Sequence, residues 1–227
     1  TTCRLGLCHS RAAARACAEA IGSAVTGLET PHDFVINVSG CPNACGQHPV
    51  GAVGLFGAAQ RINGRLVPGY RVTLGARDDE RGIRLGTMIG TVPARRLPDF
   101  LAALVKEFVA GRLDNESFGY FFERRGTDYF QNLLMNYSAV PSYEESPEFY
   151  RDWERDEDFS LAGRGAGECG SGVFEVIQAD LDQAREAIGA LGDSQGHEAL
   201  FAAMLPIVRA LLITRGVDTQ DSDAILR

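Results

Sequence analysis

The sequence lacks any hydrophobic run that approaches the ~20 residues needed to cross a lipid bilayer. It also lacks a recognisable signal peptide. Positive charge is scarce as well: the net charge of −8 at pH 7 argues against a nucleic-acid-binding protein, which would need a basic surface. We therefore expect a soluble, cytoplasmic protein with no membrane and no nucleic-acid partner. Both ends interrupt recognisable patterns, so we also expect neighbouring sequence to be missing.

Cysteine is too scarce for a disulfide-stabilised scaffold, because only six cysteines are spread over 227 residues. Their distribution is nevertheless uneven. Five of them lie within the first 45 residues: Cys3, Cys8, Cys17, Cys41 and Cys45. In a cytosolic protein, such clustering favours metal or redox chemistry over cross-links.

Hydrophobic periodicity predicts an α+β fold with a mostly antiparallel sheet in the first part of the chain. Asn63-Gly64 has the composition of a tight hairpin turn between two strands, and residues 77–81 are expected to form a charged loop. The expected strands occupy residues 33–38, 50–56 and 69–74. The expected helices occupy residues 9–25, 98–110, 115–125 and 127–134.

The composition changes after residue 140. Residues 143–158 carry eight carboxylates against two arginines, and a glycine-rich run follows at 162–167. Such a segment is typical of a solvated connector. Two amphipathic helices are expected beyond it, at 173–191 and 197–214. We therefore predict three parts: a first domain at 1–140, an acidic, glycine-rich linker at 141–170 and a small all-α domain at 171–227, which we expect to be truncated.

The most informative segment is the loop from Ser39 to His48, which reads SGCPNACGQH. Two thiolates separated by three residues, on a glycine-containing loop after a strand, can both point at one centre. A [4Fe–4S] cluster usually has four thiolate ligands, so further cysteines must come from elsewhere. This spacing favours an iron–sulfur cluster over structural zinc, whose sites usually have a two-residue spacer and four ligands within the chain. Unligated or redox-active thiols are a third interpretation.

The same loop closely resembles the second half of the siroheme/[4Fe–4S] signature of nitrite and sulfite reductases. The resemblance covers roughly residues 1–135. It implies a sandwich-like siroheme-binding half-domain of an oxidoreductase that uses six electrons to reduce sulfite to sulfide or nitrite to ammonia. The substrate would be a small inorganic anion, and the electron donor a ferredoxin or a flavoprotein. The later segments that resemble this family are 54–57, 61–70, 84–86 and 92–94.

The family pattern implies roles for individual cysteines. Cys41 would be a cluster ligand, and Cys45 would be both a cluster ligand and the axial bridge to the siroheme iron. Cys3 matches the second member of the family's first cysteine pair, whose partner would lie six positions upstream, outside this chain. The four-residue spacer between Cys3 and Cys8 departs from the pattern, so Cys8 either completes a variant ligand shell or packs as a small buried residue.

Other side chains of the loop have candidate supporting roles. Asn43 is expected to orient the cofactor or the loop, and His48 is expected to make a structural hydrogen bond rather than to bind iron. The backbone amides of Gly46 and Gln47 are candidate donors to the Cys45 sulfur. The basic residues that grip the anion lie mostly upstream in the family. We therefore assign no catalytic residue, and we do not expect this chain to catalyse alone.

Outside the loop the assignments are less specific. Arg61, Arg65 and Arg71 flank the predicted hairpin and could either face solvent or pair with the carboxylates of siroheme. Cys17 is expected in the core. Cys169, after the glycine run, could be a redox-active thiol or an ordinary surface residue.

Two rival functions remain open. One is an iron–sulfur electron-transfer module that binds no siroheme, and the other is a zinc-stabilised interaction domain. The C-terminal part is loosely similar to a HEPN-like helical extension that some bacterial nitrite/sulfite reductase-like chains carry. Such an extension implies docking or oligomerisation, and the sequence does not choose between them.

Overall fold

The computed structural model describes residues 6–26, 34–62, 64–160, 171–189, 197–214 and 225. Within these ranges the chain forms six α-helices and a mixed four-stranded sheet with the order β1-β2-β3-β6. Strand β1 runs parallel to β2, and the two remaining pairs are antiparallel. The predicted α+β fold with a mostly antiparallel sheet, followed by helices, is therefore confirmed. The strands are β1 (Ile36–Ser39), β2 (Val53–Ile62), β3 (Arg65–Leu74) and β6 (Thr87–Pro93).

Strands β2 and β3 form the central hairpin, and it is longer than expected. Ile62 pairs with Arg65, which leaves a two-residue turn, and Gly64 has a φ of 80° as such turns require. Asn63 lies outside the described residues. The extra length comes from small and polar residues between 57 and 61, whose low strand propensity concealed the end of β2. Strand β6 was not expected at all.

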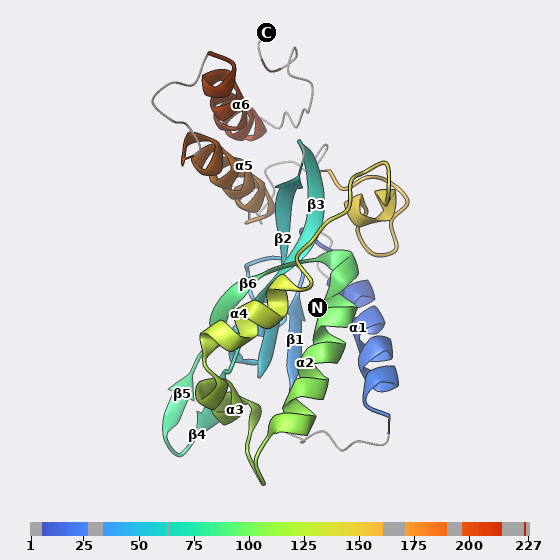
Figure 1. Cartoon of the computed structure of the whole chain (residues 1–227), viewed down its shortest axis with the longest axis vertical. Coiled ribbons are helices and arrows are strands. Elements are labelled where there is room, and N and C mark those ends of the chain that lie inside the picture. The colour runs from blue at the N-terminus through green and yellow to red at the C-terminus, as the bar shows by residue number, and fades with distance from the viewer. Residues whose placement is uncertain are drawn as a thin grey trace.

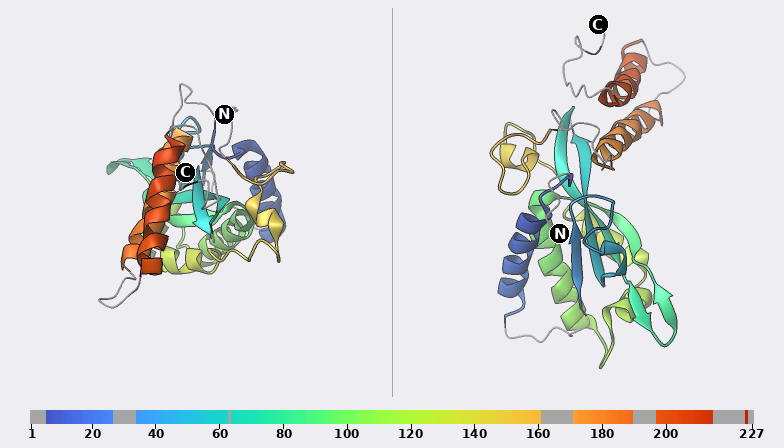
Figure 2. Two further views of the ribbon diagram at one scale, coloured as in Figure 1. Left: turned by 90° about the horizontal axis from the view of Figure 1, so that it is seen from above. Right: turned by 180° about the vertical axis from the view of Figure 1, so that it is seen from behind.

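Helices α1 to α4 form the hydrophobic core together with the strands. Helix α1 begins at Ser10, within one residue of the expected start, and His9 is its N-cap. The apolar residues at helical spacing in α2 are all buried, and so are the three phenylalanines of α3, whereas Tyr120 is half-buried. Figure 1 shows α2 and α4 in front of the sheet and α1 beside α2, and the reverse view in Figure 2 shows the sheet from its other side. The helices are α1 (Ser10–Ala24), α2 (Leu97–Gly111), α3 (Phe118–Arg125) and α4 (Thr127–Met135).

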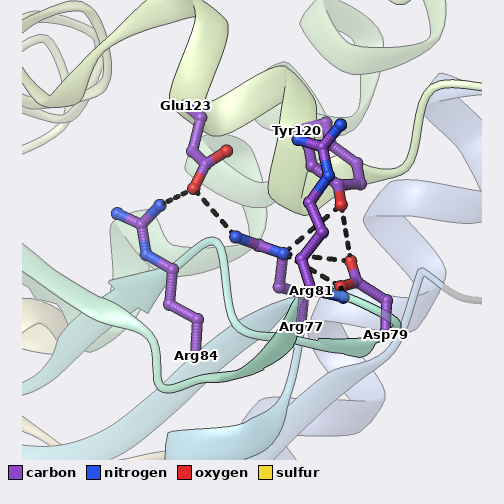
Figure 3. Close-up of polar contacts among 6 residues, drawn as sticks. All are labelled: Arg77, Asp79, Arg81, Arg84, Tyr120 and Glu123. Carbon is purple, nitrogen blue, oxygen red and sulfur yellow. Dashed lines mark hydrogen bonds and ion pairs between the residues drawn. The ribbon is translucent and has the colours of Figure 1, made fainter.

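The charged segment expected as a loop is a short hairpin made of β4 (Arg77–Asp79) and β5 (Gly82–Arg84). Contacts with α3 hold it in place. Glu123 accepts hydrogen bonds from Arg77, at 3.4 Å, and from Arg84, as Figure 3 shows. The hydroxyl of Tyr120 donates to Asp79 at 2.9 Å. Tertiary ion pairing therefore overrides the low strand propensity of these residues.

The acidic segment is only partly the solvated connector that its composition indicated. Tyr150 and Phe159 are buried, and the Trp153 indole donates to the carbonyl of Ala94 at 3.1 Å. Asp152 is also buried and accepts a hydrogen bond from the backbone N–H of His9 at 2.6 Å. The aromatic side chains within the acidic run supply the apolar surface that fixes it to the first part of the chain. The domain limits at 140 and 170 remain a prediction.

Two helices complete the described structure, α5 (Ser171–Gly189) and α6 (His197–Ile213). They pack against each other, and α5 also contacts β2. Figure 1 shows this pair beyond the turn end of the β2–β3 hairpin, with α6 farther from the sheet. In the part of the chain that is described, no helix combines the length and apolar character needed to traverse a membrane.

Candidate functional site: the cysteine loop

The cysteine loop, residues 40–47, connects the end of β1 to a short 3-10 helix, His48–Val50, that leads into β2. Along it, Asn43, Cys45 and Gln47 are exposed, whereas Cys41 is buried. Ala44 and Gln47 both adopt left-handed backbone conformations, with φ of 55° and 56°. These uncommon conformations turn the chain sharply on either side of Cys45. The loop therefore keeps one thiol inside the protein and presents the other at the surface.

The hydroxyl of Ser39 holds the two ends of the loop together. It accepts a hydrogen bond from the backbone N–H of Gly46 at 3.1 Å and lies 2.9 Å from Nδ1 of His48. Gly46 approaches the sheet so closely that an added Cβ would lie 2.2 Å from the carbonyl oxygen of Val38. Only glycine fits at such a position, so the turn after Cys45 is fixed by both packing and hydrogen bonding.

His48 has the structural role that the sequence predicted. Its ring is buried and stacks on Phe56 with ring centroids 4.5 Å apart. Burial lowers the pKa of His48, which favours the neutral imidazole. A neutral Nδ1 can accept the Ser39 hydroxyl hydrogen while the same oxygen accepts from Gly46. His48 therefore stabilises the loop through its contacts with Ser39 and Phe56.

The predicted hydrogen bonds to the Cys45 sulfur are wrong in this structure. The Gly46 amide donates to Ser39, and the Gln47 amide donates to the carbonyl of Ala44 at 2.7 Å. The thiol of Cys45 instead lies 3.9 Å from the carbonyl oxygen of Asn43. Asn43 itself is exposed next to Cys45, where its side chain is accessible to a bound group.

The N-terminal segment lies directly against the base of the loop. The backbone N–H of Cys8 donates to the carbonyl of Gly40 at 2.9 Å, and an added Cβ on Gly40 would lie 2.8 Å from the carbonyl oxygen of Cys8. Gly40, which precedes Cys41, is thus held against Cys8, which follows Cys3 by five positions. Cys3 itself lies outside the described residues.

The other described cysteines face the core. The thiol of Cys8 is buried, 3.5 Å from the carbonyl oxygen of Gly69 and 3.6 Å from that of Ala58. Cys17 is buried in α1 as predicted, and burial raises its pKa to about 12, so it stays a thiol at neutral pH. Of the two roles considered for Cys8, this environment favours that of a small packed residue.

Within the described ranges, no three His, Cys, Asp or Glu side chains are grouped so that they could hold a metal ion. Cys41 and Cys45 are therefore at most part of a ligand set. The rest would have to come from residues such as Cys3 that the structure does not describe, or from sequence beyond this chain.

Comparisons with known proteins point in one direction. No protein-family model matches the chain. It is 26% identical over 130 residues to an assimilatory ferredoxin-dependent nitrite reductase of Haloferax mediterranei, a match that covers 56% of this chain and 22% of the relative. It is 34% identical over 108 residues to a ferredoxin–nitrite reductase of Synechococcus elongatus (46% and 20%). It is 30% identical over 102 residues to a sulfite reductase [NADPH] hemoprotein beta-component of Vibrio atlanticus (44% and 16%).

Part of this chain is similar in sequence to nitrite and sulfite reductases. The chain spans about a fifth of the length of these curated relatives. The matches support the resemblance that the cysteine loop indicated. They do not test the HEPN-like similarity of the C-terminal helices, which remains a prediction, and Cys169 lies outside the described residues.

The arginines that flank the hairpin do not form one group. Arg61 is buried and binds the carboxylate of Asp180 in α5 through two nitrogens, one of them at 3.2 Å. Arg65 lies 3.7 Å from Asp158 and stacks over the ring of Tyr143. Arg71 is half-buried on β3. Neither role considered for Arg61, solvent exposure or cofactor pairing, describes its position, because a helix from the C-terminal part covers it.

Three residues that matter here were missed from the sequence. Ser39 gave no signal, because a serine at a strand end is common. Asp152 stands between the aromatic residues Tyr150 and Trp153, a context that could have indicated burial. Asp180 lies four residues from both Val176 and Ala184 on the buried face of α5. A lone carboxylate on an apolar helical stripe is a signal for a buried partner.

Proposed function

We propose that this chain is the cluster-carrying portion of a siroheme- and [4Fe–4S]-dependent oxidoreductase that reduces sulfite to sulfide or nitrite to ammonia. One observation carries the proposal. The Cys41–Cys45 loop is fixed at both ends by Ser39 and presents the Cys45 thiol at the surface. The partial similarity to both nitrite and sulfite reductases supports the same interpretation.

The residues present fit an iron–sulfur cluster in their donor chemistry. Thiolates are the usual ligands of such clusters, and Cys41 and Cys45 supply two on one loop. Cys3 is the proposed third ligand. It precedes by five residues the Cys8–Gly40 contact, and five residues of extended chain reach at most about 17 Å. A fourth thiolate, six positions before Cys3, is part of the same proposal.

Each residue of the loop then has a task. Cys41, which is buried, and Cys45, which is exposed, would hold the cluster, and Cys45 would also bind siroheme. Ser39 and His48 would hold the loop in position for this, and the exposed Asn43 would help to bind the cofactor. When bound, the two groups would supply one-electron storage and delivery for the six electrons that each reduction requires.

The partners follow from the proposed reaction. The substrate is a small inorganic anion, and the donor is a ferredoxin or a flavoprotein, working in the cytoplasm. We place the residues that grip the anion in sequence beyond this chain. This chain should therefore contribute ligands to the cofactors without turning over substrate by itself.

Absorption spectroscopy combined with metal and labile-sulfide analysis of the anaerobically purified, intact polypeptide tests this function. Siroheme bands together with iron and sulfide are the expected result. A broad sulfur-to-iron absorption without siroheme would replace the proposal with an electron-transfer module. A colourless protein that contains zinc would replace it with a zinc-stabilised interaction domain.

A further inference from the structure

The helix pair α5–α6 is attached to the sheet through α5. Val176, Asp180 and Ala184, spaced four residues apart, are all buried. Asp180 forms the ion pair with Arg61 of β2, and both side chains are fully buried. Since α5 occupies this contact, α6 lies on its outer side, as Figure 1 and the reverse view in Figure 2 show.

Helix α6 has two different faces. Its buried positions include Ala203, Pro206, Ala210 and Ile213, and Arg209 reaches Gln183 of α5 at 3.3 Å. The opposite face is open. Every exposed position of α6 whose side chain is described is uncharged: Leu200, Phe201, Ala202, Met204, Ile207 and Leu211.

The exposed residues form a regular stripe. Leu200, Met204, Ile207 and Leu211 follow one another at intervals of four, three and four residues, which is the spacing of a coiled-coil seam. Their exposed fractions are 52%, 56%, 38% and 63%, and Phe201 beside them is 41% exposed. A helix that is apolar on both its inner and outer faces is normally buried on both.

The area of the stripe is large for a free surface. A fully exposed large apolar residue has about 200 Å² of accessible surface, so the five large residues together expose about 500 Å². Apolar patches of this size on soluble proteins usually mark interaction sites. The spacing of the stripe fits another helix, and its lack of charge means that the partner surface must also be apolar.

We propose that the stripe on α6 pairs with the same stripe of a second copy of this chain, so that α6 lies antiparallel to its counterpart across a twofold axis. An uncharged, regularly spaced surface can pair with itself without like-charge repulsion, as an isologous interface requires. Two such faces bury about 1,000 Å² together, which reaches the lower range of specific interfaces. The inference is independent of the proposed reductase function, because it rests on α6 alone.

Sedimentation velocity of the intact polypeptide from about 1 µM to about 100 µM tests the pairing. The expected result is a concentration-dependent dimer. Met204→Glu places a charge in the centre of the stripe and should raise the dissociation constant by about 100-fold or more. Leu211→Glu, at the C-terminal end of the stripe, should act in the same direction. Both sites are exposed in the monomer, so circular dichroism should show an unchanged fold.

Met135→Glu is the matched control, because Met135 ends α4 and is 59% exposed, like Met204 at 56%. It should leave the dissociation constant unchanged. A wild-type protein that stays monomeric at the highest concentration would overturn the proposal, and so would a dimer that both α6 variants leave intact. A monomer in which Met204 resists chemical oxidation until it is unfolded would show instead that another segment of the chain covers the stripe.

Discussion

Replacing Gly46 with alanine tests how tightly the cysteine loop is held against the sheet. The new Cβ would lie 2.2 Å from the carbonyl oxygen of Val38 and 2.9 Å from the hydroxyl oxygen of Ser39. Because the nearest atom is backbone, the loop must move. Overpacking of this kind costs about 1–3 kcal/mol. The movement should also break the Gly46–Ser39 hydrogen bond, for a further loss of about 1 kcal/mol.

We therefore expect Gly46→Ala to lower the free energy of unfolding by about 2–4 kcal/mol. Gly22→Ala is the matched control: Gly22 is an exposed residue of α1 with no neighbouring atom within 4 Å of an added Cβ. Alanine there should stabilise the protein by about 0.5–1 kcal/mol, since it is a better helix former than glycine. Urea denaturation followed by circular dichroism measures both changes. Equal stability of the two variants would refute the packing account of the loop.

Three further predictions concern the buried ion pair, the thiols and the loop histidine. Arg61→Met should lower the free energy of unfolding by about 3–5 kcal/mol in urea denaturation, because it leaves the Asp180 carboxylate buried and unpaired. Adding Asp180→Leu should recover most of the loss, and a double variant as unstable as the single one would contradict this. In the apoprotein, Cys45 should react rapidly with a maleimide at neutral pH and Cys17 only after unfolding, as mass spectrometry of the labelled peptides can show; rapid native labelling of Cys17 would be inconsistent with its burial. Burial lowers the pKa of His48 below its ordinary value of 6.5, so its contribution to stability is present above pH 6.5 and is lost as the pH falls below it. His48→Phe should flatten that part of the stability–pH curve, and an unchanged slope would count against a buried, neutral His48.

Local chemistry made much of the fold predictable from the sequence. Helix α2 follows from Pro98 in its first turn and from five apolar residues at helical spacing, and it runs within one residue of the expected limits. The Asn63-Gly64 turn and the loop with its two cysteines are equally local signals. Each of these features depends on neighbours within about ten residues of sequence.

The features that were missed depend on contacts between distant segments. Strands β4 and β5 pair because Arg77 and Arg84 meet Glu123 of α3, about 40 residues later, and neither arginine favours a strand on its own. The Arg61–Asp180 pair joins residues 119 positions apart. The sequence left Arg61 open between solvent exposure and pairing with siroheme, and only the fold shows that its partner is Asp180.

The central claim is that the sulfur of Cys45 is shared between an iron–sulfur cluster and the iron of siroheme. Its most direct test is the siroheme and labile-sulfide content of the intact polypeptide with Cys45→Ser, purified without oxygen beside Cys17→Ser. The account predicts that the first variant loses both cofactors and that the second, altered only in the core of α1, keeps them. A Cys45→Ser protein with full siroheme content and normal turnover would contradict it.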